Sequence, residues 1–243
     1  MIFGLDLLDP KIWISLMTLT VLEVVLGIDN IIFISILSGK LPLSEQRRAR
    51  SIGLLVALFA RLGLLGSIFW LTKLTATLFE VMGHGFTGKD LVMLSGGIFL
   101  IWKSVHEIHG EIEGGHIGAE GKARVSLSSV IAQIVVVDLV FSIDSVITAV
   151  GLVKELEVMI GAVVLAMFVM LAASGVISGF VQKHPSIKML ALAFLILVGV
   201  ILVADGWGQH VERGYIYFAM AFSFAVEMLN IHLRARRERL KGH

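Results

Sequence analysis

The sequence has no cysteine and little charge for its length. With no cysteine among its 243 residues, the chain can form neither disulfide bonds nor thiolate metal sites. Only 16% of the residues are Asp, Glu, Lys or Arg, whereas 57% are hydrophobic, and the mean hydropathy is +0.92. This is too little polar surface to cover the core of a soluble domain of this size. The composition therefore indicates a membrane protein.

The apolar residues occur in long continuous runs and not in the short alternating segments of barrel strands. Because only helices and closed barrels satisfy the backbone polar groups in lipid, we expect an all-α protein that crosses the membrane several times. The formal net charge of +1 gives no indication of nucleic-acid binding. The sequence has no catalytic triad, phosphate-binding loop or dinucleotide fingerprint, so we expect neither enzymatic activity nor an organic cofactor.

Seven segments have the ~20 residues needed to cross the hydrocarbon core of a bilayer. The first follows Asp6 and Asp9 and not the basic residues of a secretory leader, so we expect it to be retained as a span. No change in composition divides the chain, and we expect residues 1–243 to form one transmembrane domain. The expected spans are residues 12–38, 51–73, 90–108, 128–152, 158–181, 187–205 and 214–233.

Basic residues are concentrated in alternate connections between these spans. They cluster after the first, third, fifth and seventh spans, whereas the other connections hold single lysines or arginines. By the positive-inside rule, we expect a multi-pass membrane protein with its N-terminus outside and its C-terminus in the cytoplasm. The clustered residues are Lys40, Arg47, Arg48, Arg50, Lys122, Arg124, Lys183, Lys188, Arg234, Arg236, Arg237, Arg239 and Lys241.

Two stretches in the first and fourth spans have nearly the same sequence. EVVLGIDNII begins at Glu23 and DLVFSIDSVI begins at Asp138, and each has two acids with five residues between them, followed by an amide or hydroxyl residue. Because a unit of three spans is odd, the second unit must enter the membrane upside down. We predict two inverted three-helix repeats, residues 12–108 and 128–205, followed by a seventh helix. Transporters commonly place the substrate site at the interface of such repeats, near the midplane.

The two stretches place carboxylates where hydrocarbon is expected, which is costly unless they face the bundle interior or water. On an ideal helix, residues six apart lie about 120° apart around the axis, so the two acids of one stretch would face different directions. Gly27 in the first stretch and Ser142 in the second would permit local breaks. We expect both helices to be interrupted at these points, which turns all four acids inward.

Carboxylate, amide and hydroxyl oxygens suit hard or borderline divalent cations such as Mg²⁺, Ca²⁺ and Mn²⁺. Without the metal, some buried carboxylates would hold protons, which offers proton exchange as a coupling route. The alternative is that the acids form structural ion pairs, with Arg61 and Lys103 as the available partners, but two cations cannot neutralise four acids. Arg61 could be such a fixed partner, or it could act as a gate that pairs with an acid when the metal leaves. The candidate metal ligands are Glu23, Asp29, Asn30, Asp138, Asp144 and Ser145.

Two further stretches accompany the acidic ones, SGGIFLIWKSVHEIH from Ser95 and GYIYFAMAFSFAVEMLN from Gly214. With them, the chain resembles the TerC family of integral membrane proteins, within the wider group of LysE-like transporters, over nearly its whole length. The resemblance implies seven spans in the bacterial inner (plasma) membrane, export of manganese, and a metal site at the six ligands given above. We therefore interpret the chain as a Mn²⁺ exporter that contacts membrane lipid. The alternative is a non-transporting membrane scaffold in a stress-response or membrane-assembly complex.

Two weaker signals lie outside the acidic stretches. The segment VHEIHGEIEGGHIGAEGK holds His106, His109 and His116 among four glutamates; it could gather a transition metal before transport, or it is only a solvated loop. Glu227 and Asn230 lie three apart on the seventh span and share a helix face. They could support the site, or they could lie at the membrane interface.

Overall fold

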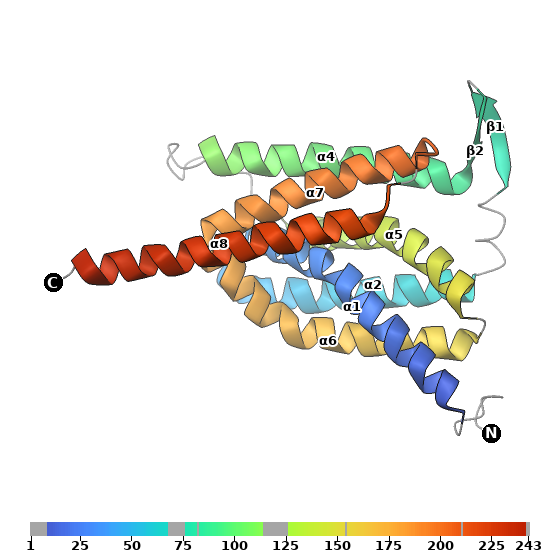
Figure 1. The fold of residues 1–243 in the computed structure, drawn as a ribbon, viewed down its shortest axis with the longest axis horizontal. Helices are drawn as coiled ribbons and strands as arrows, with labels where there is room; N and C mark the ends of the chain where they lie inside the picture. The colour runs from blue at the N-terminus through green and yellow to red at the C-terminus, as the bar shows by residue number, and fades with distance from the viewer. Residues whose placement is uncertain are drawn as a thin grey trace.

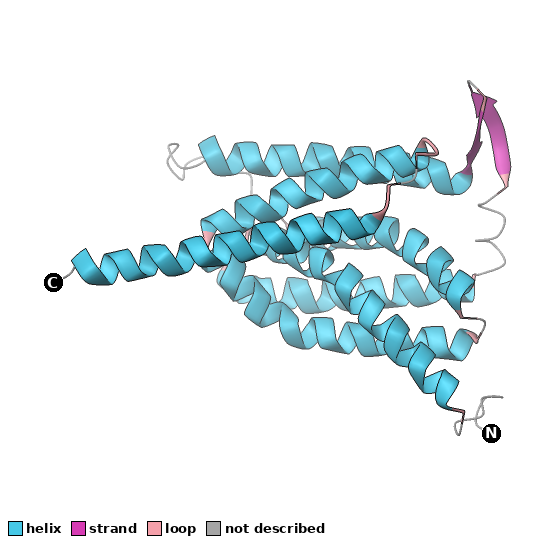
Figure 2. Cartoon of the chain, in the orientation of Figure 1, coloured by secondary structure: helices cyan, strands magenta, loops and turns pink. Residues whose placement is uncertain are grey.

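The computed structural model describes residues 9–67, 76–81, 83–113, 126–153, 155–209 and 211–241. Within these ranges, seven helices are long and apolar enough to cross a membrane, which confirms the expected all-α class and the number of spans (Figures 1 and 2). The helices are α1 (Pro10–Ser38), α2 (Leu43–Gly66), α4 (Gly88–Glu113), α5 (Leu127–Leu152), α6 (Leu156–Lys183), α7 (Pro185–Gly206) and α8 (Arg213–Lys241).

Successive helices run in opposite directions, so α1 begins on one side of the molecule and α8 ends on the other (Figure 1). The helix α8 lies along α7, and its apolar part is exposed to the surroundings. An apolar helix surface that no protein covers is expected to face lipid, since lipid tails are as apolar as leucine. The alternation agrees with a bundle whose two termini lie on opposite sides of the membrane.

The packing of the helices has a matched pattern. Helix α1 packs on α6, and α2 packs on α5. Helix α1 also contacts α7, and α4 contacts α5. In addition, α1 contacts α5, α2 contacts α6, and α4 contacts α7. If α1, α2 and α4 correspond to α5, α6 and α7, a two-fold axis would produce these contacts between the two groups of helices. The pattern is therefore compatible with the inverted repeat, whose boundaries remain a prediction.

Glycine allows α4 and α7 to approach closely. A Cβ atom on Gly97 of α4 would lie 2.6 Å from the carbonyl oxygen of Gly199 on α7. A Cβ atom on Gly199 would lie 2.9 Å from the carbonyl oxygen of Gly97. Small residues at such crossings let helix backbones come together in lipid, where van der Waals packing replaces the hydrophobic drive for association.

A short β-hairpin precedes α4, and the sequence analysis did not predict it. The strands β1 (Thr77–Val81) and β2 (His84–Thr87) pair antiparallel, and Gly83 in the turn has a φ of +81°, which favours glycine. Phe86 is buried and meets Trp207, beyond the end of α7, edge-to-face. At the base of the hairpin, the backbone N–H of Thr87 donates to Asp90 at 2.8 Å, and the N–H of Asp90 donates to the Thr87 hydroxyl at 3.2 Å. This reciprocal pair caps the start of α4.

Two helices extend beyond the expected spans, both at basic residues. Helix α2 begins at Leu43 and not near residue 51, so Arg47 and Arg50 lie on its first turns and not in a loop. Helix α8 continues through the basic tail to Lys241. Hydropathy identifies the apolar part of a helix, and it does not detect the polar residues with which the helix continues. Residues 68–73, which were expected to end the second span, lie outside the described residues.

Candidate functional site

The described polar side chains of the two repeated stretches form one stripe on each helix. Glu23 and Asn30 lie seven residues apart on α1, which is two helical turns. On α5, Asp138 is followed by Ser142 and Ser145, which continue the same face. The side chains of all five are buried, with relative exposures of 4% or less. The two stripes meet near the middle of the bundle, where α1 contacts α5.

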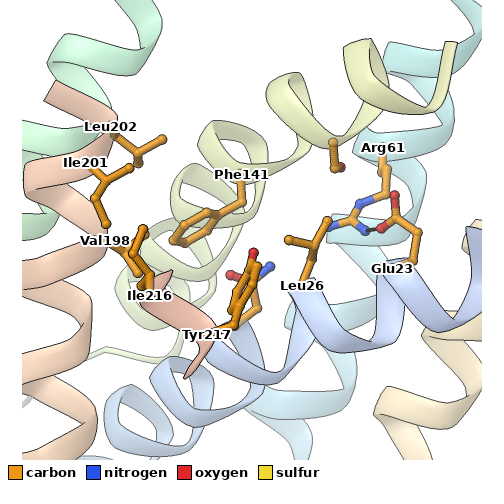
Figure 3. Close-up of a pocket in the computed structure, with 11 residues that line it drawn as sticks. Glu23, Leu26, Arg61, Phe141, Val198, Ile201, Leu202, Ile216 and Tyr217 are labelled. Atoms are coloured by element: carbon orange, nitrogen blue, oxygen red, sulfur yellow. Dashed lines mark hydrogen bonds and ion pairs between the residues drawn. The ribbon is translucent and has the colours of Figure 1, made fainter. Parts of the chain in front are cut away.

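Arg61 of α2 joins the two stripes, and its own side chain is 2% exposed. One terminal nitrogen, Nη1, donates to Oε2 of Glu23, and the two side chains point toward each other in Figure 3. The other, Nη2, donates to Oδ1 of Asp138 at 3.0 Å. The Nε–H donates to the hydroxyl of Ser142 at 2.9 Å, and that hydroxyl donates to Oδ2 of Asp138 at 3.2 Å. One guanidinium thus binds acids from both repeated stretches.

Asn30 completes the cluster on the side of a cavity. Its Nδ2 donates to Oδ1 of Asp138 at 3.2 Å. Its Oδ1 is buried and has no hydrogen-bond partner among the described residues. A buried amide oxygen without a partner is costly and uncommon, and it is one of the atoms that a cation would use.

The cavity beside the cluster has an empty volume of about 630 Å³, part of which is open space outside the protein. Its polar lining consists of Glu23, Asn30, Arg61, Ser145 and the phenol of Tyr217. The rest of the lining is apolar and comes from α1, α5, α7 and α8, with Val198 of α7 and Ile216 of α8 among its residues (Figure 3). A pocket with apolar walls and few convergent polar groups is the usual form of a binding site.

Glu23 also borders a second, smaller and apolar cavity. Leu19, Leu65 and Ala149 are among its lining residues, which come from α1, α2, α5 and α6. Leu19 lies one turn before Glu23 on α1, and Leu65 one turn after Arg61 on α2, so the cavity lies toward the side on which α1 begins. The carboxylate of Glu23 therefore stands between two spaces in the bundle.

The expected breaks in the first and fourth spans are wrong. Both α1 and α5 are continuous through Gly27 and Ser142. At Gly27 the absence of a side chain serves packing, because a Cβ atom there would lie 2.4 Å from Sδ of Met170 on α6. At Ser142 the hydroxyl binds Arg61 and Asp138 and does not satisfy freed backbone groups.

The structure places four of the six predicted ligands together, namely Glu23, Asn30, Asp138 and Ser145. Asp29 and Asp144 belong to the helical backbone of α1 and α5, but their side chains lie outside what the structure describes. Their part in the site therefore remains a prediction. Among the described side chains, no group of three or more His, Asp or Glu could hold a metal ion. The described cluster supplies two carboxylates.

Arg61 and Ser142 complete the cluster, although neither was among the predicted ligands. The signal for Ser142 was its place four residues after Asp138, which puts both on one face of a helix. For Arg61 the sequence offered two roles, as a fixed partner of an acid or as a gate. No sequence pattern indicates that it reaches acids on two helices at once. The suggested partner role of Lys103 is wrong, because its ammonium pairs with Glu107 at 2.9 Å.

The histidine segment is only partly described. Glu107 within it is buried and pairs with both Lys40 and Lys103, so this glutamate is not solvated as the loop interpretation required. His106 stacks on Trp102, and exposed His109 lies 2.9 Å from Glu113. His116 lies outside the described residues. On α8, Asn230 is exposed and donates to Glu227 at 3.4 Å; neither residue lines the cavity.

Comparisons with known proteins agree with this architecture. The profile of the Integral membrane protein TerC family matches residues 8–241. The UPF0053 inner membrane protein YgdQ of Escherichia coli (strain K12) is 51% identical over 223 residues, which is 92% of this chain and 94% of YgdQ. A UPF0053 protein of Haemophilus influenzae is 52% identical over 227 residues, 93% of this chain and 96% of that protein.

A longer relative shares the same region. The UPF0053 inner membrane protein YoaE of Escherichia coli (strain K12) is 51% identical over 225 residues, which is 92% of this chain but 43% of YoaE. The chain therefore spans less than half the length of YoaE. No solved structure matches the chain.

Proposed function

The chain belongs to the TerC family of integral membrane proteins, and from this premise we propose that it exports a divalent metal cation, Mn²⁺, from the cytoplasm across the inner membrane. The proposed site is the buried cluster between α1, α2 and α5, with Asp29 and Asp144 as further ligands. Protons are the proposed coupling ions. The proposal also takes the N-terminus to be outside, as the distribution of basic residues predicts.

One observation carries this proposal. Glu23 and Asp138, which the two repeated stretches supply from separate helices, are brought to one buried position beside a cavity. Burying two carboxylates in a bundle costs several kcal/mol, and the helices could pack without them. Such residues in membrane spans usually mark an ion or substrate path. A scaffold that binds partners at its surface would gain nothing from this cluster.

The chemistry of the cluster supports a hard or borderline cation. The described donors are the carboxylates of Glu23 and Asp138, the unpaired amide oxygen of Asn30 and the hydroxyl of Ser145. All are oxygen atoms, which Mg²⁺, Ca²⁺ and Mn²⁺ prefer and which soft metal ions bind less well. Among these, we propose Mn²⁺ because the TerC resemblance implies export of manganese.

The two cavities beside Glu23 suggest a route. The larger cavity reaches Glu23 from the side of α7 and α8, and the apolar one lies between Glu23 and the side on which α1 begins. An apolar constriction can stay closed to hydrated ions until it wets. We propose that metal leaves the site through this apolar region.

The direct test is metal flux with the purified protein in liposomes that contain a Mn²⁺-sensitive dye. We expect the wild type to admit Mn²⁺ and Asp138→Asn to be nearly inactive. Glu227→Gln is the matched control, because this glutamate lies on a span but outside the cavity, and it should transport normally. Competition by Ca²⁺ and Mg²⁺ reports the metal preference. Wild-type liposomes that behave like empty ones would reject the proposal and favour a scaffold.

A further inference from the structure

The guanidinium of Arg61 occupies the place that a metal ion would need. It binds Glu23 of α1, Asp138 of α5 and Ser142 of α5 at once. These carboxylates are the charged ligands that the structure describes in the proposed site. A divalent cation could not bind both of them while a second cation sits between them, because like charges at such short distances repel strongly in a medium of low dielectric constant.

The charge of the described cluster leads to the same conclusion. Two carboxylates and one guanidinium leave a formal charge of −1, which half neutralises a divalent ion. If Arg61 moves away from the carboxylates, the charge available to the metal becomes −2. Arg61 itself lines the cavity, so the cavity is the side toward which its side chain would move.

Helix packing alone does not require a cation at this place. In the alignment of the two stretches, Gly27 of α1 corresponds to Ser142 of α5. Ser142 meets Arg61 of α2, whereas Gly27 meets the thioether of Met170 on α6, which is 1% exposed. The second contact joins corresponding helices without any charge. Because the Gly27–Met170 contact packs without a charged group, the guanidinium in the Ser142–Arg61 contact is not needed for packing. This indicates that Arg61 has a role besides holding the helices together.

We propose that Arg61 is a built-in competitor of the transported metal, a deduction that rests on the proposed function. When the metal enters from the cytoplasm, the guanidinium leaves Glu23 and Asp138 and the metal takes its place. When the metal departs outward, Arg61 returns and neutralises the empty site. Arg61 therefore lowers the affinity for the metal and speeds its release. It is a positioning residue of the site and contributes no ligand atom.

The test compares Arg61→Gln with wild type in metal binding, transport and thermal stability. The glutamine keeps hydrogen-bonding ability but removes the competing charge. We expect the Kd for Mn²⁺, measured by electron paramagnetic resonance, to fall by about tenfold, while the maximal flux in liposomes falls by a similar factor because release becomes slow. Without metal the variant should melt below wild type, and Mn²⁺ should raise its Tm more than it raises the wild-type Tm.

Arg50→Gln is the matched control. Arg50 lies on the same helix as Arg61, but it donates to Ser178 and not to the site. Its replacement should leave the Kd for Mn²⁺, the maximal flux and the Tm unchanged.

A purely structural Arg61 gives a different result. Arg61→Gln would then have a lower Tm than wild type, Mn²⁺ would not raise that Tm, and the affinity of the variant for Mn²⁺ would be unchanged or weaker. An unchanged or weaker Mn²⁺ affinity in a folded Arg61→Gln variant overturns the inference. If Arg61→Gln does not fold, Ser142→Ala decides the question, since it removes one hydrogen bond that holds the guanidinium and one that holds Asp138, and leaves every charge in place. It should tighten Mn²⁺ binding, and unchanged or weaker binding rejects the inference. Wild-type protein that neither binds nor transports Mn²⁺ would instead reject the proposed function.

Discussion

The Oδ1 atom of Asp138 accepts two hydrogen bonds, one from Nη2 of Arg61 at 3.0 Å and one from Nδ2 of Asn30 at 3.2 Å. Asp138 thus connects α5 to α2 and α1 through a single oxygen atom. Since Glu23 binds the same guanidinium, the three charged side chains form one buried unit. Removing a charge from this unit has consequences that depend on which charge is removed.

We expect Arg61→Gln to destabilise the protein more than Asp138→Asn does. Without Arg61, two carboxylates remain buried with no counter-ion, and loss of one partner from a buried ion pair costs about 3–5 kcal/mol. Without the charge of Asp138, Arg61 and Glu23 remain as a neutral pair. Thermal unfolding in detergent should rank the metal-free proteins as wild type, Asp138→Asn and then Arg61→Gln. The double variant should be more stable than Arg61→Gln alone, and a double variant that melts lower still would show that the charges are not coupled.

Asp29→Asn and Asp144→Asn should each lower Mn²⁺ flux by about tenfold or more, because a divalent cation in a dry site needs anionic oxygen that an amide does not supply. Neither variant should melt earlier than wild type, since a neutral side chain is cheaper to bury than a charged one. Flux and melting temperature are to be measured on the same preparations. Glu157→Gln, which neutralises an exposed acid at the start of α6, serves as the control. Stable variants with normal flux would remove both acids from the site.

Gly97→Ala should loosen the contact between α4 and α7. The new Cβ atom would lie 2.6 Å from the carbonyl oxygen of Gly199, and backbone must move to relieve the overlap, at a cost of about 1–3 kcal/mol. Gly175→Ala on α6 is the matched control, because no atom lies within 4 Å of its new Cβ. Melting in detergent should separate the two. An equal melting temperature for both variants would mean that the close approach contributes nothing to stability.

The absence of cysteine makes the orientation directly measurable. Glu80 in the strand β1 and Arg237 near the end of α8 are both exposed. The hairpin and the end of α8 lie on opposite sides of the bundle (Figure 1). If the C-terminus is cytoplasmic, a membrane-impermeant maleimide should label Glu80→Cys from the outside, and should label Arg237→Cys only after the membrane is permeabilised. The cysteine-free wild type gives the background. Labelling in the reverse order would invert the predicted topology and the direction of transport.

Hydropathy was sufficient to predict the seven spans, because a bilayer requires each segment to be long and apolar. It failed where structure does not depend on lipid, as in the hairpin before α4 and in the polar ends of α2 and α8. The repeated stretches pointed to Glu23 and Asp138 because buried acids are rare in membrane spans. The bridge made by Arg61 could not be predicted, since it depends on how far α2 is rotated against α1 and α5. The expected breaks at Gly27 and Ser142 were wrong because local sequence permits a break but packing decides whether one forms.

The continuity of α1 and α5 limits what kind of site this fold can offer. In an uninterrupted helix the carbonyl oxygens bind N–H groups one turn away, whereas transporters with unwound helices use such carbonyls to coordinate ions. In the proposed site, every ligand atom contributed by these helices has to belong to a side chain, and each side chain is specified by one codon. If the chain exports a metal as proposed, single substitutions would be enough to change the metal preference in evolution, with no rebuilding of the backbone.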